Sequence, residues 1–123
     1  MKTEHKSVGD FGEASACTYL KHRGYKILER NYRNRGGEID IIAYDKSCTV
    51  FIEVKTRKNS LYGNASEFVD FRKQQKIILC AKYYLGDNID EEVRFDVVEV
   101  YYYEKGDSLI LKEINHIKDA FVS

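Results

Sequence analysis

The sequence predicts an α/β (α+β) fold, in which a mixed central sheet is flanked by helices. Short runs rich in Ile, Val and Phe recur along the chain, as is typical of β-strands. Two longer segments carry apolar residues at the spacing of amphipathic helices. In chain order these segments give αβββαββ. A chain of 123 residues with no prolines and no repeats is expected to form one domain over residues 1–123.

The first helix is predicted over residues 6–23. Ser7 can cap its N-terminus, and Gly24 ends it. Glu13 stands out in this segment, because apolar residues follow it at i+3, i+4 and i+7 and place it on the inward face. From the residues alone, Glu13 is either an acid at the helix edge with its head in water or an acid that serves a site.

Three strands are predicted to follow this helix. Residues 25–33 form the first, and residues 34–37 turn the chain with two glycines. Residues 37–43 and 50–55 form the next two. Because their connection is short, they are expected to pair as an antiparallel hairpin.

The rest of the chain alternates loops with regular elements. We expect in order a loop, a helix, an acidic loop, two strands and a short helical turn, over residues 58–64, 67–85, 86–92, 93–103, 108–114 and 115–121. Phe71 is expected on the inward face of the helix. Asp96, inside a strand, has two open interpretations, a buried ion pair with a core arginine and a catalytic role.

Two acids and a lysine converge in the predicted hairpin. Its register brings Asp40 near Glu53, and Lys55 projects from the same strand face as Glu53 because side chains alternate. Like charges on a half-buried strand cost free energy, which Mg²⁺ or Mn²⁺ would offset. With a lysine to hold phosphate or water, this set suits phosphodiester hydrolysis. A cross-strand salt bridge is the alternative at this stage.

Basic side chains near these residues could hold a phosphate backbone. Arg57 continues the face of Glu53 and Lys55 and has the planar fork that suits phosphate. Residues 21–35 contain six Lys or Arg, among them Arg33 and Arg35, against one Glu. The net charge of the whole chain is zero. The basic stretch is therefore either a face turned to phosphate or an ordinary solvated surface.

Five short motifs carry a resemblance to a known family. They occupy residues 9–14, 24–28, 37–40, 51–57 and 94–98, and read GDFGEA, GYKIL, GEID, FIEVKTR and RFDVV. Their order resembles that of the YraN family, small bacterial proteins of the PD-(D/E)XK nuclease superfamily that are similar to archaeal Holliday-junction resolvases. The similarity extends from about residue 9 to residue 121.

The resemblance implies a restriction-endonuclease-like αβββαβ core and a metal-dependent endonuclease that cuts DNA, including branched or junction DNA in repair or recombination. Asp40, Glu53, Lys55 and Glu13 would be catalytic, and the three acids would hold Mg²⁺ or Mn²⁺. Lys73 matches a family lysine and would contact DNA.

Junction resolvases are usually basic dimers, so we expect a homodimer that pools two basic faces. The alternative is a non-catalytic nucleic-acid-binding or repair-partner module that keeps the nuclease fold. The three cysteines have no metal or disulfide spacing, and no apolar run is long enough to span a bilayer. A cytoplasmic protein with no membrane partner is therefore expected.

Overall fold

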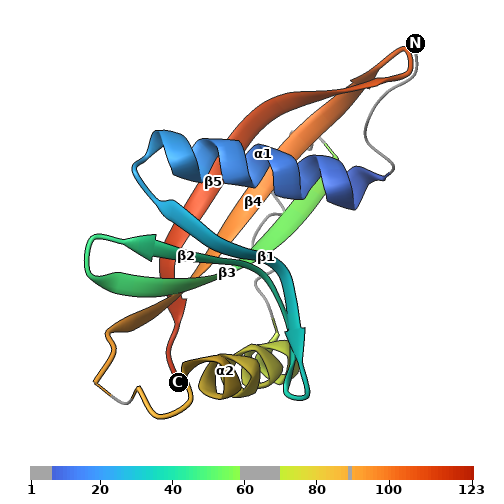
Figure 1. Cartoon of the computed structure of the whole chain (residues 1–123). Helices are drawn as coiled ribbons and strands as arrows, with labels where there is room; N and C mark the ends of the chain where they lie inside the picture. Colours follow the sequence, from blue (N-terminus) through green and yellow to red (C-terminus); the bar gives the residue numbers. More distant parts are fainter. Residues whose placement is uncertain (1–6, 59–69, 89) are drawn as a thin grey trace.

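The computed structural model describes residues 7–58, 70–88 and 90–123, which form a five-stranded mixed sheet with two helices (Figure 1). The elements are α1 (Val8–His22), β1 (Lys26–Asn34), β2 (Gly37–Asp45), β3 (Cys48–Lys58), α2 (Phe71–Leu85), β4 (Val93–Lys105) and β5 (Ser108–Phe121). The strands lie side by side in chain order, and only β3 and β4 are parallel neighbours. This architecture confirms the predicted fold class.

The first helix, α1, packs on one face of the sheet. Ser7 caps it as predicted, since its side chain accepts a hydrogen bond from the Asp10 backbone N–H at 3.0 Å. Ala16 and Leu20 are fully buried in a cluster with alternate residues of β2, β3 and β4. Gly12 lies directly on Thr56 of β3, where any Cβ would collide. The close approach keeps Glu13 near the sheet.

The second helix, α2, packs on the opposite face. Asp70 caps it, accepting a hydrogen bond from the Lys73 backbone N–H at 2.9 Å; the predicted start at residue 67 lies outside the described residues. Ile77 and Ala81 are buried with Phe51 of β3. The inward placement of Phe71 is wrong, because this first helical residue precedes the turns that reach the sheet and is 72% exposed.

The C-terminal segment corrects another prediction. Residues 115–121 continue strand β5 and do not form a helical turn. Ile117 pairs with Val97 of β4, and the ring of Phe121 stacks on that of Phe95 with centroids 5.1 Å apart. Register shifts along the β4–β5 pair let the strand bend and continue. Burial of Phe121 therefore outweighs the weak strand pattern of this segment.

All three cysteines lie within the residues that the structure describes. Cys17, Cys48 and Cys80 are free thiols, and Cys17 and Cys80 are buried. Neither α1 nor α2, the helices within the described ranges, is long and apolar enough to span a membrane. The predicted loop over residues 58–64 lies outside the described residues from residue 59 onward.

Candidate active site

The sheet opens between β2 and β3. Their ladder runs from the Asp45–Cys48 pair to the Ile41–Ile52 pair and ends there. The next pair would be Asp40 and Glu53. Instead, Oδ2 of Asp40 accepts a hydrogen bond from the backbone N–H of Val54 at 2.8 Å. A side-chain carboxylate thus replaces a strand carbonyl, and we call this place, between Asp40 and Glu53, the fork.

Asp40 and Glu53 form an acid pair at the fork, as the hairpin register predicts. Burial, and then the charge of Asp40, raise the pKa of Glu53 to about 7, and protonated Glu53 donates a hydrogen bond to Asp40. Burial also raises the pKa of Asp40, although the Val54 N–H opposes this shift. The two acids therefore share a proton near neutral pH. Such a pair can exchange its proton for a cation.

Lys73 forms an ion pair with one member of this acid pair, a contact that the sequence did not reveal. Its Nζ lies 2.9 Å from Oε2 of Glu53. The hydrogen bond to Glu53 raises the pKa of Lys73, so the ammonium stays charged at neutral pH. The sequence-based prediction gave Lys73 a contact with DNA instead. The first turn of α2 thus delivers a positive charge to the fork.

Lys55 lies on the same strand face as Glu53. The β3–β4 ladder is continuous over this region, so side chains alternate regularly and Lys55 and Arg57 share the α2 side of the sheet. Lys55 forms no ion pair with any residue that the structure describes. Arg57 is held differently, with Nε 3.6 Å from Oε2 of Glu99, a carboxylate that is only 1% exposed. Arg57 therefore compensates a buried charge, and little of its guanidinium faces solvent.

Glu13 approaches the fork from the α1 side. Its Oε1 accepts hydrogen bonds from Nδ2 of Asn31 at 2.8 Å and Nη2 of Arg30 at 3.4 Å. Burial, and then the charge of Asp40, raise the pKa of Glu13. Glu13 and Asp40 line one cleft of about 230 Å³ with Asn31 and Thr56. Sequence analysis missed Asn31, whose backbone is left-handed (φ 51°) and whose position in a strand pattern gives no such signal.

The three predicted acids are not gathered into one ligand set. Within residues 7–58, 70–88 and 90–123, no three His, Cys, Asp or Glu side chains are arranged so that they could hold a metal ion together. Asp40 and Glu53 are in contact, while Glu13 lies across the cleft and pairs with Arg30. The fork thus contains two carboxylates, those of Asp40 and Glu53. The third acid, Glu13, stays on the other side of the cleft, where it is hydrogen-bonded to Asn31 and Arg30.

Basic residues line a second cleft beside the fork. This cleft, of about 400 Å³, lies between the β1–β2 turn and α2 and includes Arg33, Lys73 and Lys76. Arg33 pairs with Glu38 through exposed side chains, Nη2 to Oε1 at 2.9 Å. The guanidinium of Arg35 lies 5.1 Å from the centre of the Tyr83 ring. We call the hollow lined by Arg33, Lys73 and Lys76 the basic cleft.

A second buried cluster surrounds Asp96, which is fully buried. Arg94 binds it in bidentate fashion, Nε to Oδ1 at 2.9 Å and Nη2 to Oδ2 at 3.0 Å. Nε2 of His116 lies 2.8 Å from Oδ2, and the backbone N–H of Asp119 donates to Oδ1 at 2.9 Å. The contact with Arg94 is the predicted ion pair with an arginine and lies within β4, whereas the contacts with His116 and Asp119 tie β5 to β4. The cluster has the contacts of a structural anchor.

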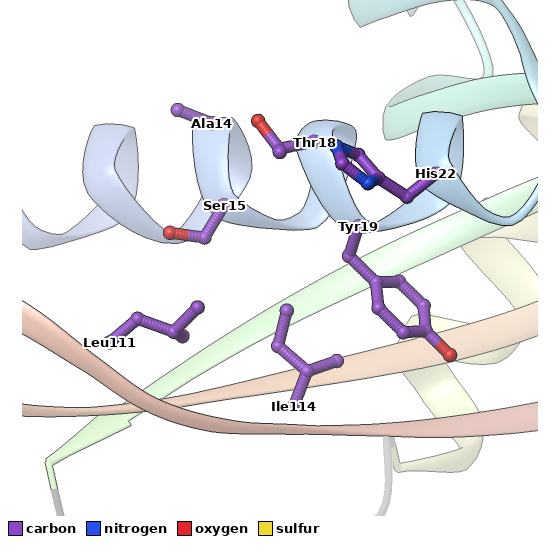
Figure 2. A pocket seen from close by; sticks show the side chains of 7 residues that line it. All are labelled: Ala14, Ser15, Thr18, Tyr19, His22, Leu111 and Ile114. Atoms are coloured by element: carbon purple, nitrogen blue, oxygen red, sulfur yellow. The ribbon is translucent and has the colours of Figure 1, made fainter.

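A hollow of about 670 Å³ lies elsewhere, between α1 and β5 (Figure 2). Figure 2 shows Leu111 and Ile114 extending from β5 toward α1, with Leu111 below Ser15 and Ile114 nearer the ring of Tyr19. Its lining is mostly apolar, and β5 lies two strands away from β3 and the fork. The chemistry of charged groups is therefore concentrated at the fork and not in this hollow.

The fold and this site define the structural class of the protein. A mixed five-stranded sheet with two helices is consistent with a restriction-endonuclease-like α/β core. The model of the Uncharacterised protein family UPF0102 matches residues 12–100, and the chain belongs to that family, the YraN family.

Its relatives support this assignment. A UPF0102 protein of Caldanaerobacter subterraneus subsp. tengcongensis is 46% identical over 122 residues, 98% of each chain. One of Acetivibrio thermocellus is 48% identical over 123 residues, 98% of this chain and 95% of the relative. One of Clostridioides difficile is 48% identical over 119 residues, 95% of this chain and 98% of the relative.

Proposed function

We propose that this protein is a metal-dependent endonuclease that hydrolyses phosphodiester bonds of DNA, branched and junction structures included. The acid pair at the fork is the observation that carries the proposal. A buried carboxylate in hydrogen-bond contact with a half-buried one, with Lys73 beside them, is costly to fold and has a use in phosphoryl chemistry. A residue set needed only for stability would have no reason to place them together.

The donors at the fork fit Mg²⁺ or Mn²⁺. Carboxylate oxygens of Asp40 and Glu53 are the hard ligands that these ions prefer, and Mg²⁺ commonly uses one or two protein carboxylates while keeping several waters. A divalent cation would replace the shared proton and relieve the repulsion between the two acids. Glu13, across the cleft from Asp40, would assist as a third acid.

Lysine and metal would divide the chemical work. When bound, the ion would supply Lewis acidity toward the scissile phosphate and its attacking water. Lys55 would orient that water and stabilise the negative charge that develops on the phosphate oxygens. Strand β3 would position the metal ligand Glu53 and the ammonium of Lys55 together, because these two side chains share one face of the strand.

The basic cleft would hold the DNA backbone beside the fork. Arg33, Lys73 and Lys76 line this hollow, and Lys73 contacts Glu53, so a phosphate chain lying there would pass the acid pair. Arg35, whose guanidinium lies over the Tyr83 ring, would contact the same backbone from the β1–β2 turn. Arg57 would support this surface through its ion pair with Glu99. Because the chain has no net charge, one copy would bind DNA weakly, and a homodimer would join two basic faces.

Cleavage of labelled single-stranded, duplex, flap and four-way-junction DNA with Mg²⁺ or Mn²⁺ tests the proposal. We expect metal-dependent cutting that falls by about a hundredfold or more in Asp40→Asn and Lys55→Met. Asp107→Asn is the control, because Asp107 is an exposed acid in the turn between β4 and β5 and should change the rate little. No cutting by a wild-type protein that still binds Mn²⁺ and DNA would favour the alternative, a non-catalytic binding module.

A further inference from the structure

The ion pair between Lys73 and Glu53 is asymmetric in exposure. The side chain of Lys73 is 50% exposed, whereas that of Glu53 is only 8% exposed. The carboxylate is fixed in the fork, but the ammonium can leave it by a change of rotamer and enter water. Nothing else needs to move, because Asp70 holds the backbone of Lys73 at the start of α2.

The ammonium of Lys73 also occupies the place that a cation would take. It lies 2.9 Å from Oε2 of Glu53, so it uses the lone pairs that a metal ion would need. An ammonium donates hydrogen bonds and cannot ligate a metal, so the two cations exclude each other at this oxygen. On leaving, Lys73 remains in the basic cleft with Arg33 and Lys76, where a phosphate chain would lie.

We propose that Lys73 is an exchangeable counter-ion of the acid pair. In the metal-free protein its ammonium pairs with Oε2 of Glu53 and balances the negative charge that the acid pair keeps when it shares one proton, and it moves to a DNA phosphate when a divalent cation occupies the fork. Metal binding would thereby switch on one phosphate contact, so metal and DNA would bind cooperatively. The inference rests on the proposed function, since it assumes that the fork takes a divalent cation.

Titration of Mn²⁺ into the DNA-free protein by calorimetry tests the competition. Lys73→Met is expected to bind Mn²⁺ about tenfold more tightly than wild type, because no charge-assisted hydrogen bond has to be broken. Lys76→Met is the matched control. It removes the same charge from the next turn of α2 and the same cleft, and should change affinity by about twofold or less.

Several outcomes would overturn the inference. Unchanged or weaker Mn²⁺ binding by Lys73→Met, or an equal gain in Lys76→Met, would show that Lys73 does not compete for the site. If the wild type binds Mn²⁺ and cuts DNA under those circumstances, only the inference fails. If no variant binds Mn²⁺, the inference and the metal-dependent function fail together.

The salt dependence of DNA binding tests the second part of the proposal, the move of Lys73 to a DNA phosphate. With Ca²⁺ in place of Mg²⁺, Lys73→Met should lower the slope of log Kd against log salt by about one, as expected for one lost phosphate contact. Without a divalent cation the slopes of wild type and variant should agree. An equal loss of slope in both conditions would mean that Lys73 contacts DNA regardless of the metal.

Discussion

Replacing Glu53 by glutamine removes the ionisable group of that residue and keeps the shape of its side chain. A glutamine amide can still donate a hydrogen bond to Asp40, as protonated Glu53 does. The pKa of Glu53 is about 7 in the folded protein against an ordinary value of 4.5, a difference that already includes the favourable contact with Lys73. Above pH 7 this difference costs about 3 kcal/mol of folding free energy.

The sign of this effect can be worked out from the two pKa values. Because the folded value is higher, the folded protein binds more protons between pH 4.5 and about 7, and its stability falls as the pH rises through this range. Glu53→Gln lacks this loss. At pH 8.5 we expect it to be more stable than wild type by about 3 kcal/mol, or about 10 °C in Tm, and at pH 5 by less than about 1 kcal/mol.

Urea unfolding in EDTA at pH 5, 7 and 8.5 measures this difference. Asp107→Asn serves as the control, since that exposed acid in the β4–β5 turn should change stability little at any of these pH values. If Glu53→Gln were less stable than wild type at pH 8.5, or if its difference from wild type did not vary with pH, the acid pair would not be costly. A cost to stability would then be no sign that the fork is kept for function.

Three other substitutions test the framework around the fork. Asp96→Asn should cost about 3–5 kcal/mol by urea unfolding, because it removes the fully buried carboxylate that binds Arg94 in bidentate fashion and leaves Arg94 with the weaker ion pair to Asp45, at 3.4 Å. Burial alone would raise the pKa of Asp96, but the hydrogen bonds from its partners outweigh burial and lower the pKa. The stability of the wild-type protein should therefore also drop below pH 3.8 in an acid titration, and a flat profile would contradict this. Gly12→Ala should cost about 1–3 kcal/mol, and the loss should shrink when Thr56→Ala is added, because this removes the Oγ1 and Cγ2 atoms that the new methyl group would meet; full additivity in the double-mutant cycle would argue against the contact. Phe121→Ala should cost about 3–5 kcal/mol in thermal unfolding, whereas a change below about 1 kcal/mol would mean that the end of β5 is not part of the core.

Much of the fold follows from patterns that the sequence displays openly. Ile, Val and Phe runs with short turns predict β2, β3 and their antiparallel pairing, and Ser7 marks the start of α1. The last strand was harder to predict. Residues 115–121 mix polar and apolar side chains, so their own pattern does not predict a strand. Their strand conformation depends on partners in β4 that are distant in the sequence, such as Phe95, which pairs with Phe121, and Asp96, which accepts a hydrogen bond from the Asp119 backbone N–H.

The site was predictable where it depends on local register. Asp40 and Glu53 meet because a short hairpin fixes which residues face each other. Contacts between distant elements had no such signal. Lys73 reaches Glu53 only because α2 packs on that face of the sheet, and Arg57 faces Glu99 only because β3 and β4 are parallel neighbours.

The most direct test of a metal site at the fork is NMR line broadening by Mn²⁺. At substoichiometric Mn²⁺, the amide signals of Asp40, Glu53 and Val54 should lose intensity first, and Asp40→Asn should abolish this selectivity. Residues 86–92, a separate acidic segment, provide the internal comparison. If signals of that segment broadened first, and Asp40→Asn made no difference, the fork would not be a metal site and the proposed endonuclease mechanism would be wrong.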